Sequence, residues 1–320
     1  MTANETAFKQ HYLLSLNELA DLLNENRDDL KKQLNSEGIQ SESGGRTFVS
    51  GEQVRECLQI KGHSFAPTVI SHLNLKGGIG KTTASISLAS RAKSYGYKTC
   101  ILDLDPQGSA TLAFDQIPDG DEPIFSDLWQ EADSVDEADL KEIENGLFIL
   151  PSSLDNSLLD SSLQNPLSQR TAVSNVCDAL KKCGFDLIVI DTPPSLGAAV
   201  ISSICASDTV VIPIYSDAFS FKGLEITMKE IGSICQAFNI SMPRVKSLFT
   251  RYDKREKATE LALAKLKEEY SDIFIGQVIR TSTLFSKALE QNTSVFAFTQ
   301  KNAAKDDYDA YTRYILNLNF

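Results

Sequence analysis

Apolar and polar positions follow two different patterns along the chain, and the change between them falls near residue 67. Before it, apolar residues recur at helical spacing in three stretches, residues 16–24, 29–38 and 50–60. A short β-prone run at 47–49 separates the second stretch from the third. The resulting order of helix, turn, helix, wing and helix predicts a small domain over residues 1–61, followed by a linker over residues 62–67.

After the change, apolar runs with strand character alternate with helical stretches. The expected strands are residues 68–75, 98–105, 146–152, 185–192, 208–215, 245–250 and 273–279. Repeated strand and helix units of this kind predict an α/β domain over residues 68–320, with a mostly parallel sheet and helices on both faces. The acidic stretch 119–145 is expected to be a surface excursion between two strands.

Composition agrees with a globular protein of the cytoplasm, with 42% apolar and 23% charged residues. No apolar run reaches the ~18 residues that a membrane span needs, and the first ten residues lack the pattern of a signal peptide. The six cysteines are scattered without a C-x-x-C pair, so we expect free thiols and no zinc site. The net charge of -12 opposes binding to DNA unless a local basic patch, or a dimer, provides the contact.

A glycine-rich segment carries the clearest chemical signal, because it joins an expected strand to an expected helix. Its residues are Lys76, Gly77, Gly78, Ile79, Gly80, Lys81, Thr82 and Thr83. A glycine-rich turn at a helix N-terminus exposes backbone N–H groups and the positive end of the helix dipole to phosphate oxygens. We therefore expect Lys81 to reach the β and γ phosphates of ATP and the Thr82 hydroxyl to hold Mg²⁺.

Two later strands end in aspartates, Asp105 and Asp191. A carboxylate at a strand end beside the phosphates can orient the attacking water or hold magnesium. Either motif alone is more often just a strand followed by a turn. Their order after the glycine-rich segment favours a nucleotide site, in which Asp191 holds Mg²⁺ through water and Thr192 begins a nucleotide-sensing switch.

Together these motifs resemble the deviant Walker A proteins of the ParA and MinD family. The ordinary P-loop has its first glycine where this chain has Leu75, and Lys76 follows it. The resemblance covers essentially all of residues 68–320. It implies an ATPase that forms a nucleotide-sandwich homodimer, in which Lys76 crosses to the partner's nucleotide and Asp105 positions the attacking water.

The resemblance also implies a finer function. The protein would use ATP and Mg²⁺ to partition DNA. A ParB-like centromere-binding protein would stimulate ATP hydrolysis, and hydrolysis would switch the protein off. Such a protein is cytoplasmic and nucleoid-associated, with no membrane contact. Family members place residues at positions equivalent to Pro213, Thr250 and Arg251 around the adenine. A nucleotide-sensing repressor of its own operon, and an ATPase that positions a protein cargo, remain alternatives.

The N-terminal segment resembles the MerR-like or winged helix-turn-helix modules of larger plasmid partition ATPases. Its expected DNA contacts are Lys31, Lys32, Arg46 and Arg55. Seven basic and ten acidic residues nevertheless leave residues 1–61 at -3, so dimerisation or partner docking is the alternative role. On the ATPase body the expected nonspecific DNA contacts are Lys254, Arg255, Lys257 and Arg280, although basic residues so spaced also form ordinary solvated faces.

Three related classes of protein share the phosphate motifs but fit less well. A membrane-positioning ATPase of the MinD type needs a basic amphipathic C-terminal helix, and the only basic residue in 309–320 is Arg313. An iron–sulfur reductase needs cysteines soon after Asp191, and the first one is Cys205. A tyrosine kinase would use the cluster Tyr308, Tyr311 and Tyr314, whose spacing suits packing on one helix face equally well.

Overall fold

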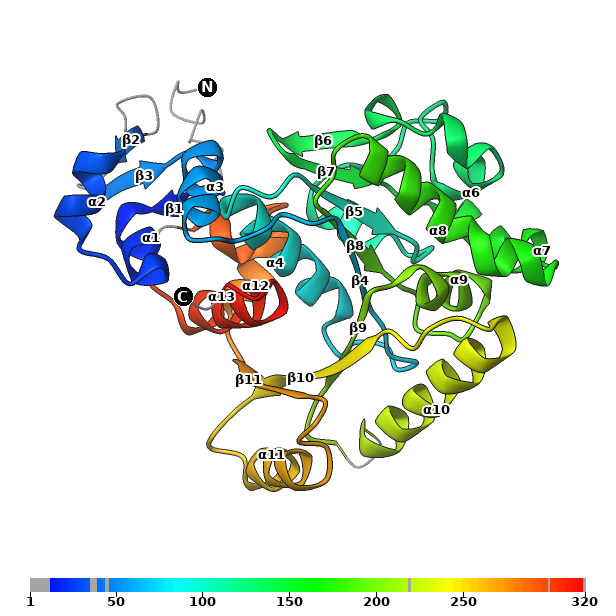
Figure 1. Cartoon of the computed structure of the whole chain (residues 1–320). Coiled ribbons are helices and arrows are strands. Elements are labelled where there is room, and N and C mark those ends of the chain that lie inside the picture. Colours follow the sequence, from blue (N-terminus) through cyan, green and yellow to red (C-terminus); the bar gives the residue numbers. More distant parts are fainter. Residues whose placement is uncertain (1–11, 35–38, 44–45, 218–219, 299, 319–320) are drawn as a thin grey trace, which may run out of the picture.

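The computed structural model describes residues 12–34, 39–43, 46–217, 220–298 and 300–318, with the backbone alone for 39–43 and 46. One large sheet runs through the molecule in the order β11-β10-β9-β4-β8-β5-β7-β6 (Figure 1). Its strands are β4 (Thr68–His72), β5 (Thr99–Asp103), β6 (Lys141–Glu144), β7 (Leu147–Leu150), β8 (Leu187–Asp191), β9 (Thr209–Ile214), β10 (Arg244–Tyr252) and β11 (Phe274–Arg280). All neighbours are parallel except β6 and β7. The expected mostly parallel sheet is therefore confirmed.

Helices cover both faces of the sheet. Successive residues of each strand point to opposite sides, and the apolar side chains on both sides are buried under helices. In β8, Leu187 and Val189 join one apolar cluster, whereas Ile188 and Ile190 join another. The first face is covered by α4 (Lys81–Ser94), α5 (Ser109–Ala113), α12 (Leu284–Glu290), η4 (Val295–Ala297) and α13 (Ala303–Ile315). The second is covered by α6 (Phe125–Leu128), α7 (Leu159–Ser162), α8 (Pro166–Lys182), α9 (Ala198–Ala206), α10 (Ser220–Phe238) and α11 (Lys257–Glu269). Among the described residues no helix combines the length and the apolar character needed to cross a membrane.

The acidic excursion contains short elements that the sequence pattern did not predict, and one of them is a strand of the large sheet. The excursion contains α6 and the short 3-10 helices η1 (Trp129–Ser134) and η2 (Glu137–Asp139). It ends in the strand β6, which pairs antiparallel with β7 at the sheet edge. Three of the four residues of β6 are charged, so it lacks the apolar signal of a buried strand. Charged side chains are typical of an edge strand that must not pair with other molecules. A further 3-10 helix, η3 (Leu154–Leu158), precedes α7.

The described residues of the N-terminal segment form three helices and a small antiparallel sheet in the order β1-β3-β2. Its elements are β1 (Leu14–Ser15), α1 (Leu16–Leu23), α2 (Arg27–Gln33), β2 (Ile39–Ser43), β3 (Arg46–Val49) and α3 (Gly51–Ile60). Side chains cap all three helices at their N-termini, from Ser15, Asn26 and Ser50. The element order agrees with the pattern in the sequence, while helix-turn-helix function stays a prediction.

The N-terminal segment packs directly on the α/β domain that follows it. Leu16, Leu19 and Leu58 belong to the same apolar cluster as the sheet face under α4. Within the expected linker, His63 Nε2 lies 2.5 Å from the Tyr97 hydroxyl, and the Phe65 and Tyr97 ring centroids are 4.6 Å apart. Residues 62–67 therefore contribute packing contacts as well as a chain connection.

Candidate nucleotide site

The loop between β4 and α4 has the backbone geometry of a phosphate cradle. Gly78 and Gly80 have φ values of +71° and +93°, in the left-handed region that side chains disfavour. Gly80 is the N-cap residue of α4, and no side chain caps this helix. The first N–H groups of α4 have no intrahelical acceptor, which is the arrangement that binds phosphate oxygens.

The two lysines of the loop direct their ammonium groups to different partners. Lys81 is buried, and its Nζ donates to the carbonyl oxygen of Lys76 over 3.4 Å. Burial lowers the pKa of Lys81, against the charges of Asp191 and Asp105. Lys76 is half-exposed, and its Nζ forms an ion pair with Asp217 and a 3.2 Å hydrogen bond to the Tyr215 hydroxyl. Lys81 thus belongs to the cradle, whereas Lys76 lies at its margin.

Three aspartates gather where β5 and β8 end. Asp103 and Asp191 are paired in register across these strands. Thr111 donates to Asp103 Oδ2 from its backbone N at 2.9 Å and from its hydroxyl at 2.8 Å. Burial raises the pKa of both Asp103 and Asp191. Asp105 follows in the next loop, where its Oδ1 accepts from Gln107 N over 3.0 Å.

The residues around Asp191 fit a bound magnesium ion. Ser85 Oγ donates to Asp191 Oδ1 over 3.1 Å, while the buried Oδ2 has no hydrogen-bond partner in the described part of the chain. The Thr82 hydroxyl lies close enough to lower the pKa of Asp191, against the effect of burial. No group of three or more acidic, histidine or cysteine side chains is arranged for a metal among the residues described. Mg²⁺ beside a nucleotide needs few protein ligands, because phosphate and water oxygens complete its shell.

Two of the residues expected around the adenine support the loop itself. The Thr250 hydroxyl lies 2.9 Å from the carbonyl oxygen of Ile79 and 3.0 Å from that of Ile214. The carbonyl of Pro213 accepts from Asn74 Nδ2 over 2.8 Å, and Asn74 Oδ1 accepts from Lys76 N. Arg251 is exposed and its guanidinium lies 5.5 Å from the centroid of the Tyr215 ring. These positions border the loop, and contact with adenine stays a prediction.

Comparison with known proteins agrees with this geometry. A family model described as an AAA domain matches residues 67–244, more than half of the chain. The chain is 31% identical over 259 residues to an uncharacterized protein of Methanocaldococcus jannaschii, covering 78% of this chain and 98% of that protein. It is 26% identical over 241 residues to the sporulation initiation inhibitor protein Soj of Bacillus subtilis, covering 75% of this chain and 94% of Soj. The chain belongs to the ParA/MinD type of this family.

A solved structure shows the same fold. It is a protein of Borrelia burgdorferi assigned to plasmid partition and bound to AMPPNP, which matches with a TM-score of 0.65 and 23% identity. The match covers 78% of this chain and 99% of that chain. This likeness shows that the chain has the P-loop NTPase fold.

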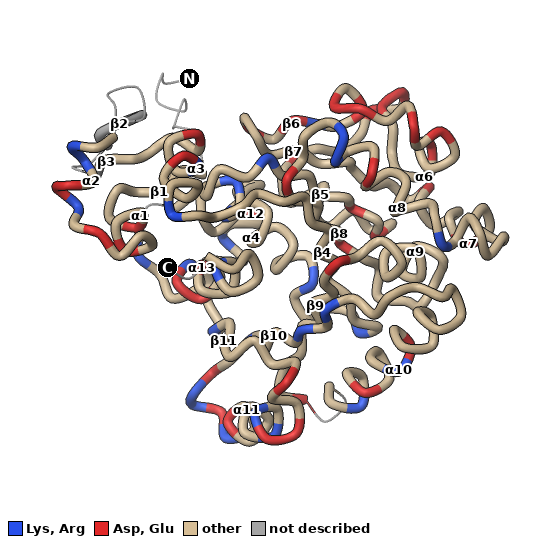
Figure 2. The backbone as a smooth tube through the Cα atoms, in the orientation of Figure 1, with Lys and Arg blue, Asp and Glu red and all other residues tan. Residues whose placement is uncertain are grey.

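Apart from Arg46 and Arg55, the residues expected to contact DNA are exposed, one group on the large domain of this ParA-type chain and the other on α2. Lys254 and Arg255 are exposed in the loop after β10, where Arg255 pairs with Asp253, and Lys257 is exposed at the start of α11. Arg280 forms a bidentate pair with Asp307 in α13. Lys31 and Lys32 are exposed on α2, and the side chain of Arg46 lies outside the described residues. Figure 2 shows acidic residues mixed with the basic ones around α11 and α2, so neither group forms a purely basic surface.

Arg55 has a contact that differs from the expected one. Its guanidinium donates to Asp186 over 2.6 Å and 3.1 Å, and to the carbonyl oxygen of Gly96 over 2.9 Å. It also lies 4.0 Å from the centroid of the Phe65 ring. Arg55 therefore joins α3 to the α/β domain, because Asp186 and Gly96 accept its hydrogen bonds, and we leave it out of the proposed DNA contacts.

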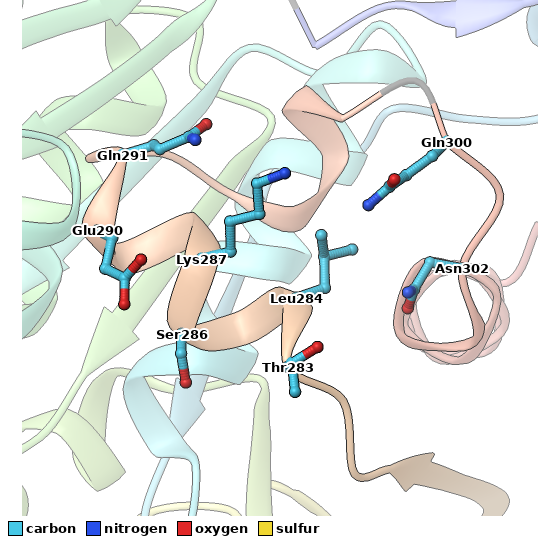
Figure 3. Close-up of a pocket in the computed structure, with 8 residues that line it drawn as sticks. All are labelled: Thr283, Leu284, Ser286, Lys287, Glu290, Gln291, Gln300 and Asn302. Carbon is cyan, nitrogen blue, oxygen red and sulfur yellow. The ribbon is translucent and has the colours of Figure 1, made fainter.

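The lining of a surface pocket of about 480 Å³ includes none of the residues of the nucleotide site (Figure 3). Its lining comes from α12 and from the approach to α13, namely Thr283, Leu284, Ser286, Lys287, Glu290, Gln291, Gln300 and Asn302. None of these residues was expected to bind ATP. The sequence analysis did not identify Ser85 or Asp103, although Ser85 lies one helical turn after Lys81 and Asp103 lies in the expected strand 98–105.

Proposed function

We propose that this chain is an ATP-dependent DNA partition ATPase that dimerises on ATP, binds DNA and is switched off by hydrolysis. The family supports the ATPase class, and the relatives of the Soj and ParA kind support the partition role. A ParB-like centromere-binding protein would stimulate hydrolysis. The N-terminal segment would add either an operator contact or a docking surface.

The placement of Lys76 is the observation that carries the proposal. Lys81 already supplies a buried cation to the cradle, while the Lys76 ammonium is held at the margin by Asp217 and Tyr215. A cation at the edge of a phosphate site is available to a nucleotide on a facing subunit, as an arginine finger is. This supports a nucleotide sandwich in which each subunit completes the other's site.

The remaining residues have separate parts in the proposed reaction. The N–H groups at the start of α4 and Lys81 bind the phosphates, and Asp105 orients the attacking water. Thr82 and Asp191 would hold Mg²⁺, with Asp191 acting through water, and the ion neutralises charge on the phosphate oxygens when bound. Thr192 donates from Oγ1 to the carbonyl oxygen of His72 over 2.8 Å, so it connects the switch segment to the strand before the loop.

DNA binding by the full-length protein tests the function, measured with ATP, with ADP and without nucleotide. We expect binding with ATP alone, because only a dimer would bring enough basic residues together against the net charge of -12. Lys254→Ala with Lys257→Ala should weaken it, and Lys31→Ala with Lys32→Ala is the matched double substitution in the N-terminal segment. Binding in all three nucleotide states that only the second pair removes would favour the repressor. ATP turnover without any DNA binding would favour an ATPase that positions a protein cargo.

A further inference from the structure

A chain of polar side chains crosses the core beneath the nucleotide site. The Tyr311 hydroxyl in α13 lies 2.7 Å from His72 Nε2 in β4. The other ring nitrogen, Nδ1, lies 3.0 Å from Ser85 Oγ in α4, and that oxygen lies 3.1 Å from Asp191 Oδ1. All four side chains are fully buried. Three elements of the fold therefore meet at the carboxylate expected to hold Mg²⁺.

When Asp191 is ionised, as a ligand in a Mg²⁺ site is, only one arrangement of protons makes all three of these hydrogen bonds at once. With Asp191 ionised, its Oδ1 only accepts, so the Ser85 hydroxyl donates to it. Burial lowers the pKa of His72 to about 3, so the ring is neutral and carries one proton. That proton must be on Nδ1, donating to Ser85 Oγ, and Nε2 then accepts from the Tyr311 hydroxyl.

One competing acceptor lies near Ser85. The carbonyl oxygen of Lys81 is 3.2 Å from Ser85 Oγ. An ionised carboxylate accepts a stronger hydrogen bond than a neutral carbonyl, so the Ser85 proton is expected on the side of Asp191. The chain therefore has one direction, from Tyr311 toward the carboxylate.

We propose that Tyr311, His72 and Ser85 are positioning residues, which hold Asp191 Oδ1 so that Oδ2 is presented to the Mg²⁺ of the bound nucleotide. The buried Oδ2 has no hydrogen-bond partner in the described part of the chain, as expected of an oxygen reserved for the metal shell. The inference rests on the proposed function, because it needs a Mg²⁺–nucleotide site at Asp191. It adds to that function by making the C-terminal helix α13 part of the site.

The Mg²⁺ dependence of nucleotide binding tests this role. N-methylanthraniloyl-ADP is titrated onto the full-length Tyr311→Phe protein at a series of Mg²⁺ concentrations, and its fluorescence reports binding without any turnover. We expect the half-saturating Mg²⁺ concentration to rise about 3- to 10-fold, the effect of one hydrogen bond, with the Mg²⁺-free affinity unchanged. Ser85→Ala removes the direct hydrogen-bond partner of Asp191 and should raise the half-saturating Mg²⁺ concentration about 10- to 100-fold.

Tyr308→Phe is the matched control for Tyr311→Phe. Tyr308 is one turn earlier in α13 and fully buried, and its ring packs edge-on against those of Phe285 and Tyr311. In the described residues no hydrogen bond of its hydroxyl is seen. Its Mg²⁺ dependence should equal that of the unaltered protein. Equal behaviour of the two phenylalanine variants would overturn the proposal, since a purely structural role affects both alike.

The position of the His72 proton is a second, independent measurement. Nitrogen-15 NMR of histidine-labelled, nucleotide-free protein distinguishes the two tautomers, and the three histidines are assigned with His11→Gln and His63→Gln. We expect Nδ1–H in the unaltered protein. An Nε2–H tautomer would mean that the hydrogen bonds run in the opposite direction, from Ser85 toward Tyr311, and would overturn the proposal. The expected tautomer in a protein that binds no nucleotide would contradict the proposed function instead.

Discussion

At the scale of single residues, nucleotide binding is expected to depend on Lys81. Its ammonium is the buried cation of the cradle, and charge-assisted hydrogen bonds contribute ~1.5–3 kcal/mol. Lys81→Ala should therefore weaken the equilibrium binding of labelled ATP by at least about tenfold. Lys93→Ala is the control, because Lys93 is in the same helix but pairs with Glu144. Unchanged ATP affinity in Lys81→Ala would show that the loop is not the phosphate site.

Substitution of Asp105 should stop ATP hydrolysis without affecting ATP binding. The carboxylate lies in the loop after β5, where Gln107 N holds its Oδ1, and it is expected to orient water without bearing on affinity. Asp105→Ala should bind ATP as the unaltered protein does and lose steady-state phosphate release, since general-base assistance contributes ~10²–10⁴ in rate. Phosphate release at the unaltered rate would rule out this role.

Whether a residue can be recognised from the sequence depends on where its partners are. Lys81 and Thr82 are recognisable because their function follows from adjacent glycines and a helix start. His72 and Ser85 are not, because their contacts require β4, α4, α13 and β8 to meet. Arg55 shows the same limit, since only the fold reveals Asp186 beside it.

At the scale of elements, α3 docks on the end of α4 where only glycine fits. Gly96 has a φ of +84°, and a Cβ there would lie 2.5 Å from Gly51 O and 2.7 Å from Arg55 Cβ. Gly96→Ala should lower the free energy of unfolding by ~1–2 kcal/mol for the backbone conformation and ~1–3 kcal/mol more for the collision. Urea unfolding measures the sum.

Gly184→Ala isolates the backbone contribution. Gly184 has a φ of +83° and nothing within 4 Å of an added Cβ, so Gly184→Ala should lower the free energy of unfolding by only ~1–2 kcal/mol. Equal losses in the two variants would mean that α3 does not approach α4 as closely as described.

The predictability of an element follows from how it is buried. The seven expected strands are apolar runs, and all of them form, because both faces of a parallel sheet are covered. The edge strand β6 was missed because Lys141, Glu142 and Glu144 leave one apolar residue in it. Its pairing depends on the neighbouring β7 more than on its own pattern.

At the scale of the whole molecule, the N-terminal segment and the α/β domain share one apolar cluster. Glu18 of α1 pairs with the buried Arg91 of α4 over 2.9 Å, and Arg55 of α3 pairs with Asp186. The apolar residues of the N-terminal segment belong to the same cluster as those of the sheet face under α4. Removing residues 1–61 would expose this surface, so their function is better tested by substitution in the full chain.

The proposed dimer predicts that two inactive variants restore each other. Lys76→Ala should keep ATP affinity within a few fold while losing dimerisation and hydrolysis, because the missing cation is worth ~10³–10⁵ in rate in comparable arginine fingers. In a heterodimer with Asp105→Ala, the Lys76→Ala subunit keeps its own Asp105 and receives Lys76 from its partner. That one composite site is complete, and the other lacks both groups.

The two variants are mixed before ATP is added, and phosphate release is measured. Random assortment makes half of the dimers heterodimers with one complete site each, so roughly a quarter of the unaltered rate is expected. A chain carrying both substitutions, mixed with Lys76→Ala, is the control, because no pairing of those subunits unites Lys76 with Asp105 at one nucleotide. If heterodimers form without turnover, or if Lys76→Ala alone is fully active, Lys76 does not act across the interface, because its ammonium would then be dispensable or would serve its own nucleotide.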